Sequence, residues 1–240
     1  MAKEKAQKQT KEQDGQPTPE QPEELVYEKG KDYPIEEAVE LAKKMSKTKF
    51  DASIEVAFNL GIDPKKGDQQ VRSAISLPHG TGKNIKVAAF VESDKEQEAK
   101  DAGADVVGGE NLVEEIKNSG TTDFDMAVAQ TSMMKKMTEI AKTLGTRGLM
   151  PSPKNDTVTD DPAKAVKELK KGKISFKNDK TGNVHATIGK VSFDNEKLVE
   201  NFHTILEAIR KAKPAASKGT YIKNISISST MGPGIKVALK

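Results

Sequence analysis

The sequence predicts a protein of mixed α/β and α+β class with two domains: a chain-end α+β domain with an antiparallel sheet, and an inserted Rossmann-like three-layer α/β domain. Alternating apolar and polar residues, typical of half-buried strands, occur towards both ends of the chain. Between them, short continuous apolar runs alternate with helical segments, which is typical of a parallel sheet covered on both faces. The change of pattern near residues 80 and 172 predicts that one domain is inserted into the other.

The domain boundaries follow from these changes. Residues 1–30 form a low-complexity segment that lacks enough apolar residues to offset its ordering entropy, so we expect a disordered N-terminal tail. We assign residues 31–80 together with 173–240 to the discontinuous α+β domain, and residues 81–172 to the insert. Two chain connections would join the domains, and paired connections commonly form a hinge.

The first α+β segment begins with a helix and continues with two strands. Pro34 suits a first helical turn, and an apolar stripe follows at helical spacing: Ile35, Ala38, Val39, Ala42 and Met45. Residues 53–60 alternate between apolar and polar side chains, which predicts a strand with one face in water. Residues 71–78 predict a second strand that ends at Pro78.

The insert and the second α+β segment each repeat their own pattern. In the insert, apolar runs predict strands and the segments between them predict helices; the strands fall within 84–92, 105–110 and 124–130, and the helices within 95–104, 112–120, 132–144 and 161–172. Residues 173–190 then predict two strands around a turn, and residues 195–213 an amphipathic helix. In the last strand, residues 221–230, Ile222 is out of phase with Ile225 and Ile227, so we expect an irregularity between them.

Composition argues against catalysis and against a membrane location. The chain has no Cys, which excludes a disulfide framework, a Cys-ligated metal and a thiol nucleophile. The chain has three histidines, His79, His185 and His203; His203 with Glu207 lacks the second histidine of a metal-binding H-E-x-x-H motif, and Asn84 stands where a phosphate-binding Gly-Lys loop needs Ser or Thr. No apolar run approaches the roughly 20 residues of a spanning helix. We therefore expect a cytoplasmic non-enzyme with no cofactor, no metal and no membrane partner.

Positive charge is concentrated at the C-terminal end. Residues 173–240 carry 12 basic and 5 acidic side chains, an excess of seven, whereas the whole chain has a net charge of +3. A local excess of this kind attracts polyanions, nucleic acid first among them. A lysine-rich solvated surface would show the same excess, and charge alone does not separate the two interpretations.

Three predicted corners carry residues suited to RNA. Lys49 and Phe50 precede the strand that begins near Ser53, and Lys177 and Lys180 flank a predicted hairpin turn. The last strand ends in "SSTMGPG", which supplies Ser228, Thr230, Met231 and Gly232. If the three corners meet, lysines would neutralise phosphates while hydroxyls and free backbone groups bond ribose. The alternative is a plain turn with Met231 packed in the core.

Several motifs resemble those of a known family. "SSTMGPGIKV", "KFDASIEVAFNLGIDPKKGDQQVR", "SLPHGTGK", "AGADVVGGE", "DFDMAVA", "LGTRGLMPSPK" and "NDKTGNVHATIGK" occur in the order found in the bacterial L-one family of large-subunit ribosomal proteins. The resemblance covers nearly everything but the N-terminal tail, and it implies the same two-domain arrangement.

The resemblance also implies partners and contact residues. Members bind large-subunit rRNA at the mobile stalk near the exit site of the ribosome, assist release of deacylated exit-site tRNA, and repress translation by binding the mRNA of their own operon. The implied RNA-contacting positions are Lys49, Phe50, Thr230, Met231 and Gly232, with Ser53 and Ser228 as neighbours; Asn224 stands where a serine is expected, and an amide can still donate and accept. We expect a monomer when the protein is free.

Two other functions stay open at this point. A two-domain small-molecule-binding protein or enzyme would use the cleft between hinged domains. An interaction module without an RNA role would show no retention on rRNA.

Overall fold

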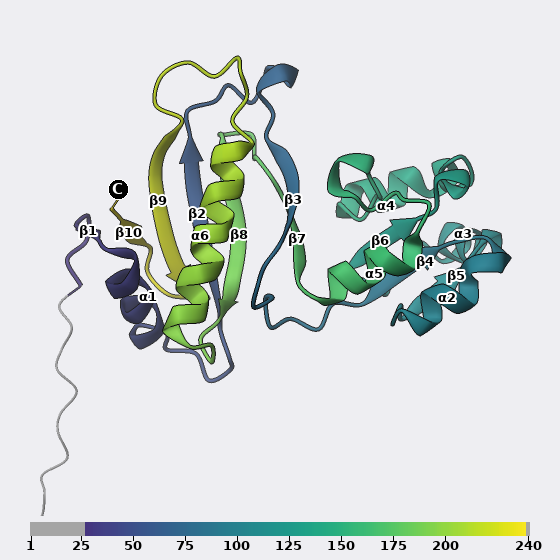
Figure 1. Ribbon diagram of the computed structural model, residues 1–240, viewed down its shortest axis with the longest axis horizontal. Coiled ribbons are helices and arrows are strands. Elements are labelled where there is room, and N and C mark those ends of the chain that lie inside the picture. The colour runs from purple at the N-terminus through teal and green to yellow at the C-terminus, as the bar shows by residue number, and fades with distance from the viewer. Residues whose placement is uncertain (1–26, 239–240) are drawn as a thin grey trace, which may run out of the picture.

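The computed structural model describes residues 27–238, which form two layered units joined by a narrow ribbon (Figure 1). The first unit is built from both ends of the chain around a five-stranded sheet of order β1-β10-β9-β2-β8. Neighbouring strands are antiparallel except β1 and β10, which are parallel. The strands are β1 (Asp32–Tyr33), β2 (Ser53–Leu60), β8 (Asn183–Lys190), β9 (Ile222–Ser229) and β10 (Ile235–Val237), and the helices of this unit are α1 (Ile35–Lys44) and α6 (Asn195–Lys211).

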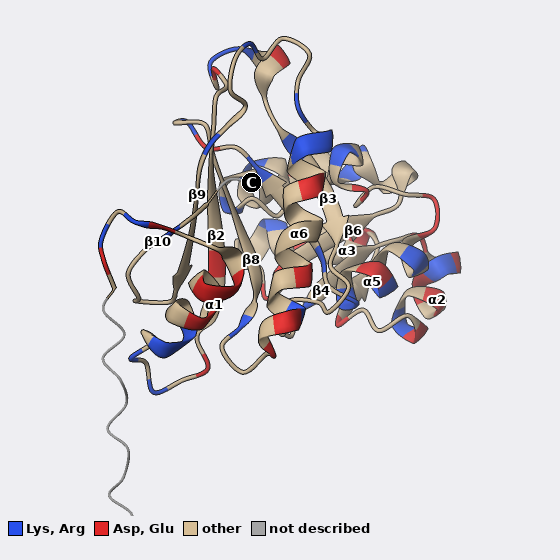
Figure 2. Ribbon diagram, turned by 60° about the vertical axis from the view of Figure 1, so that its left-hand side comes forward, with Lys and Arg blue, Asp and Glu red and all other residues tan. Residues whose placement is uncertain are grey.

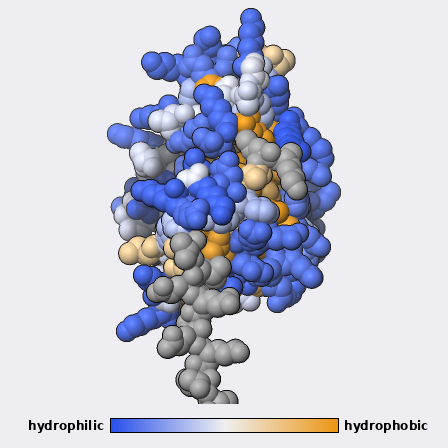
Figure 3. Space-filling model, turned by 90° about the vertical axis from the view of Figure 1, so that its left-hand side faces the viewer, coloured by the Kyte–Doolittle hydropathy of each residue, from blue (hydrophilic) through white to orange (hydrophobic). Residues whose placement is uncertain are grey.

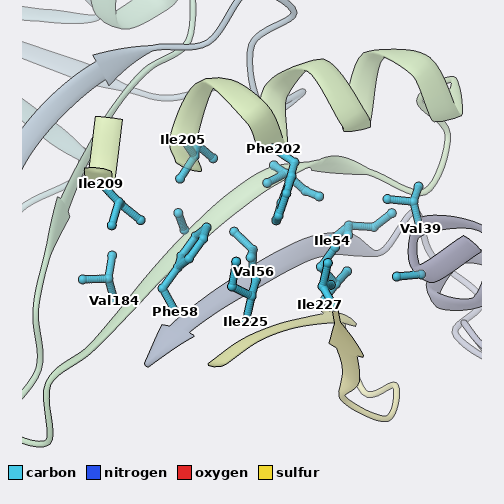
Figure 4. Packing of buried hydrophobic residues seen from close by; sticks show 14 of the residues in the cluster. Val39, Ile54, Val56, Phe58, Val184, Phe202, Ile205, Ile209, Ile225 and Ile227 are labelled. Carbon is cyan, nitrogen blue, oxygen red and sulfur yellow. The ribbon is translucent and has the colours of Figure 1, made fainter. Parts of the chain in front are cut away.

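Alternation along β2 decides which face of this sheet is covered. Ile54, Val56, Phe58 and Leu60 are at most 2% exposed, as the sequence predicts. They pack beneath α6, where Phe58 and Phe202 stack with ring centroids 6.1 Å apart (Figure 4). The residues between them point to the opposite face, which carries no helix. This second face, the open face, is lined by polar side chains of β2, β8 and β9.

Two strands leave this sheet and pair with each other. β3 (Arg72–Ser76) and β7 (Lys173–Lys177) form a two-stranded antiparallel ribbon that leads into and out of the insert. The two strands and the turn predicted over residues 173–190 are confirmed, but the strands do not pair with each other along their length: β8 pairs with β2, and one isolated bridge, Asn178 to Val184, joins it to the segment after β7. The physical reason is that β3 and β7 are the two connections to the insert. They lie side by side, and the backbone N–H and C=O groups of each strand bond those of the other.

Other details of the sheet confirm or extend the sequence prediction. The register between β2 and β9 shifts between Asn59 and Leu60, which pair with Asn224 and Ile222, so the expected irregularity is confirmed. The short strands β1 and β10 were not predicted. They add an edge on which Tyr27, the first described residue, donates a hydrogen bond to the carbonyl of Gly234 at 2.6 Å. Residues 1–26 of the expected tail lie outside the described residues.

The second unit is a three-layer insert. Its parallel sheet has the order β5-β4-β6, with a separate apolar core on each face. The strands are β4 (Val87–Phe90), β5 (Val106–Gly108) and β6 (Met126–Ala129), and the helices are α2 (Glu96–Asp101), α3 (Glu110–Ser119), α4 (Ala141–Arg147) and α5 (Pro162–Lys170). The helix predicted over 132–144 consists instead of two 3₁₀ segments, η3 (Thr131–Met134) and η4 (Lys136–Ile140), followed by α4.

The junction between the units depends on two glycines and one buried amide. A Cβ built on Gly172, whose φ is 103°, would lie 2.4 Å from the Cα of Gly80, so the two connections approach as closely as backbone allows. The Asn201 side chain, 0% exposed, donates to the carbonyls of Gly80 (3.0 Å) and Ile188 (2.8 Å) and accepts from the backbone N–H of His79 (3.3 Å). Helix α6 thereby fixes the first connection to the sheet.

The surface on the β1 side is largely hydrophilic. Figure 3 views the β1 side and shows mostly hydrophilic residues interrupted by a narrow apolar strip. Among residues 27–238, no helix combines the length and the apolar character that crossing a bilayer demands.

Candidate RNA-binding surface

A strained turn after β9 presents Met231 to solvent. The backbone N–H of Gly232 donates to the carbonyl of Ser229 at 2.8 Å, which closes a four-residue turn. Met231 occupies the third position with φ of 63°, a conformation that glycine normally supplies in such turns. Its side chain is 91% exposed, so the alternative of a methionine packed in the core is excluded. A strained residue with an exposed apolar side chain points to a binding role, because no packing contact within the fold offsets the backbone strain.

Gly232 is required by the same turn. A Cβ at this position would lie 2.2 Å from Oγ of Ser229 and 3.2 Å from the Ser229 carbonyl oxygen. The Ser229 hydroxyl is buried and has no hydrogen-bond partner among the described residues. The turn therefore exposes bare backbone beside Met231, and Ser229 fills the space beneath it.

Thr230 ties this turn to the start of β2. Its backbone N–H donates to the Ser53 carbonyl at 3.0 Å, and its hydroxyl accepts from the Ser53 N–H at 3.1 Å while lying 3.2 Å from the Ser53 carbonyl. These contacts join residues 177 positions apart in sequence. They place the segment before Ser53, which contains Lys49 and Phe50, at the same end of the sheet as Met231.

Phe50 is the second exposed apolar side chain at this end. It is 61% exposed, and Phe50 and Met231 are the exposed large hydrophobic residues of the described chain. Lys49 beside it is also exposed. The following residue, Asp51, accepts hydrogen bonds from the backbone N–H and the hydroxyl of Ser192, which anchors the loop to the end of β8. We call the group Lys49, Phe50, Ser53, Thr230, Met231 and Gly232 the Met231 corner.

The open face extends from the Met231 corner along the strands. Register places residues in rows across three strands, all of them polar except Ala57, and the rows are Ser228, Glu55 and Thr187; Ser226, Ala57 and His185; and Asn224, Asn59 and Asn183. Hydroxyl, amide and imidazole groups of this kind bond ribose hydroxyls and base edges. Sequence reasoning found Ser228 and Asn224 and missed the others, because alternation gives the face of a strand but not its neighbours.

Three predicted site residues lie at the far end of the open face. Asn224 pairs with Asn59, six residues along β2 from Ser53, which is roughly 20 Å of strand. Lys177 ends β7 and Lys180 lies in the turn before β8, and both are exposed. The condition that the three corners meet is therefore not fulfilled for Lys177 and Lys180, because β8 runs antiparallel to β2 and the turn before it lies beside Asn59, at the opposite end from Ser53.

The charges around the Met231 corner differ from those on the helical face. Lys190, at the end of β8, pairs with Ser53 in register and lies 3.7 Å from the Asp51 carboxylate through its Nζ. Helices α1 and α6 carry acidic side chains on the covered side of the sheet, among them Glu37, Glu40 and Glu200 (Figure 2). The same helices also carry basic side chains, among them Lys44, Arg210 and Lys211, whereas the rows of the open face hold one carboxylate, that of Glu55.

Comparison with known proteins matches most of this chain to one family. The sequence profile described as "Ribosomal protein L1p/L10e family" matches residues 42–233. The chain is also 55% identical over 210 residues to the "Large ribosomal subunit protein uL1" of Mycoplasma capricolum subsp. capricolum, an alignment that covers 88% of this chain and 92% of that protein. The match includes β2, the ribbon, the insert and the Met231 turn. The chain therefore belongs to the ribosomal protein L1p/L10e family.

Proposed function

We propose that the protein is a non-enzymatic constituent of the large ribosomal subunit that binds large-subunit rRNA at the mobile stalk near the exit site. One observation carries the proposal: Phe50 and Met231, both exposed, lie at one end of the open polar face of the sheet. The backbone is strained at Met231, and the next position has no room for a side chain larger than that of glycine. Family membership and the relative named above support the same partner.

Each part of the surface has a distinct task. Met231 and Phe50 pack on sugar or base faces, and the bare backbone at Gly232 admits an RNA strand closely. Lys49 neutralises phosphate, while Ser53 and Ser228 bond ribose. Asn224, Lys177 and Lys180 contribute only to an RNA that continues along the open face to its far end. Because the turn is already formed, little ordering entropy is lost on binding.

The finer roles follow from the family resemblance. We propose that the protein works in the cytoplasm as part of the ribosome, assists release of deacylated exit-site tRNA, and represses translation by binding the mRNA of its own operon. The mRNA site would reuse the Met231 corner, so an operon mRNA fragment should compete with stalk rRNA. When free, the protein should sediment as a monomer.

Filter binding to a stalk rRNA fragment tests the proposal. Met231→Asp should weaken binding at least tenfold, because it removes the apolar contact and places a carboxylate beside phosphates. The urea midpoint should stay unchanged, since the side chain is 91% exposed in the fold. Wild-type affinity in this variant would reject the Met231 corner as the site.

Thr230→Val makes a poorer probe. It removes the hydroxyl that bonds both backbone groups of Ser53, so it perturbs the end of the sheet as well as any RNA contact.

Co-sedimentation with large ribosomal subunits separates the proposed function from the small-molecule alternative. Retention on large subunits supports the proposal, whereas binding of nucleotides or metabolites without such retention favours a small-molecule-binding protein.

A further inference from the structure

A cleft at the junction of the two units lies outside the surface described above. It encloses about 670 Å³ and is lined by residues 79–86 of the first connection, by residues 169–172 at the end of α5, and by Asp105 and Phe193. This volume is typical of ligand-sized pockets, which span about 300–1,000 Å³. Both units contribute to its wall, so an occupant would contact them together.

The cleft is positively charged. Lys83, Lys86 and Lys171 line it and make no ion pair within residues 27–238. The single carboxylate of the lining, Asp105, is occupied by Lys170 at 2.7 Å. These three lysines give the junction an excess of positive charge, which attracts anions.

The first wall of the cleft is held in shape by packing. Gly82 has φ of 69°, and a Cβ there would meet the Phe193 ring at 3.0 Å and the Lys190 side chain at 3.3 Å. The buried hydroxyl of Thr81 accepts the backbone N–H of Lys83 at 3.4 Å. The turn therefore fixes where the Lys83 backbone lies and leaves its side chain directed along the edge of β8.

The cleft adjoins the RNA-binding surface. Nζ of Lys83 lies 3.5 Å from Oγ1 of Thr187, which belongs to the same row of the open face as Glu55 and Ser228. Lys190, against which Gly82 packs, pairs with Ser53 of the Met231 corner. Two lysines thus lie between the Met231 corner and the cleft: Lys190, which is also 3.7 Å from the Asp51 carboxylate, and Lys83.

We propose that the interdomain cleft binds phosphate groups of the same RNA that docks on the Met231 corner, so that one RNA strand contacts both units. The ligand chemistry is a phosphodiester held by Lys83, Lys86 and Lys171. This inference rests on the proposed function, and it adds a second contact that the Met231 corner does not supply.

The salt dependence of RNA binding measures this second contact. In full-length protein, the cleft variant Lys83→Gln, Lys86→Gln, Lys171→Gln should reduce the slope of log K against log[salt] by about two to three, because each lost phosphate contact removes about 0.7–0.9. Affinity near 0.2 M salt should fall about 10- to 100-fold. The matched control is Lys100→Gln, Lys135→Gln, Lys142→Gln, which removes equal charge from exposed lysines of the insert that lie outside the cleft and make no ion pair in the described chain. The control should change the slope by less than about one.

Each outcome separates the two proposals. Failure of the wild-type protein to bind stalk rRNA would reject the proposed function itself. Wild-type binding that Met231→Asp weakens, together with equal slopes for the cleft and control variants, would keep the proposed function and overturn the cleft. Calorimetry with pyrophosphate distinguishes the source of phosphate: binding that the cleft variant abolishes, without any change in the RNA slope, would assign the cleft to a free phosphate ligand and also overturn the proposal.

Discussion

Met231→Gly should separate stability from RNA binding at a single position. The left-handed backbone of Met231 costs roughly 1–2 kcal/mol in an L-residue, and glycine removes that strain. Glycine also gains about 0.5–1 kcal/mol of conformational freedom in the unfolded chain, which offsets part of the gain. Since the methionine side chain is 91% exposed, its loss removes almost no packing. The free energy of unfolding should therefore stay equal or rise by up to about 1 kcal/mol.

Affinity for stalk rRNA should change in the opposite direction. Partial burial of a methionine against RNA contributes about 1–2 kcal/mol, which corresponds to roughly 5- to 30-fold in the dissociation constant. Urea unfolding and filter binding measure the two effects on the same preparation. Met231→Ala keeps the strained backbone and removes the side chain, so it should lose affinity without gaining stability. Met231→Leu should preserve both. A fall in stability by more than about 1 kcal/mol for Met231→Gly, or unchanged affinity for both small variants, would refute this account of the turn.

Three further predictions concern the elements that hold the surface in place. Gly232→Ala should weaken rRNA binding through the clash with Ser229, and adding Ser229→Ala should recover much of the loss in filter binding; no recovery would place the defect elsewhere. Asn201→Ala should lower the free energy of unfolding by about 3 kcal/mol in urea, because it leaves one buried carbonyl, one part-buried carbonyl and one part-buried N–H without their partner; a change below about 1 kcal/mol would count against that anchor. The backbone N–H of Asn183 and the Thr181 hydroxyl hold the pKa of Asp179 well below its usual 3.8. This stabilisation is present above about pH 4 and is lost as the pH falls further, so urea midpoints of Asp179→Asn should depend less on pH in that acidic range than those of the wild type, and parallel profiles would contradict it.

Local patterns predicted most of the elements and the face that each buries. The alternation of Ile54, Val56 and Phe58 was sufficient to predict β2 and its buried face. The phase change after Ile222 was sufficient to predict the irregularity in β9. The residue boundaries of the two domains stay a prediction. Strand partners could not be predicted, because the pattern of β7 is equally compatible with β8 and with β3 as its neighbour.

The same limit explains what was missed at the surface. Whether Lys177 and Lys180 lie beside the Met231 corner stayed open, because their position depends on a pairing between distant segments. Thr187 and Lys190 were overlooked because nothing in their own segment indicates that Ser53 lies beside them. The exposure of Met231, which the family resemblance implied, is confirmed, whereas the turn pattern alone is compatible with a buried or an exposed side chain.

The ribbon of β3 and β7 also has a mechanical consequence. A single strand would let the insert swivel freely, but two strands tied by a ladder of hydrogen bonds resist twisting about their length and sliding past each other. Such a ribbon is softest when it flexes across its flat side. The insert should therefore move mainly in one direction, by bending of the ribbon across its flat side. The displacement of its outer helices grows with their distance from the ribbon.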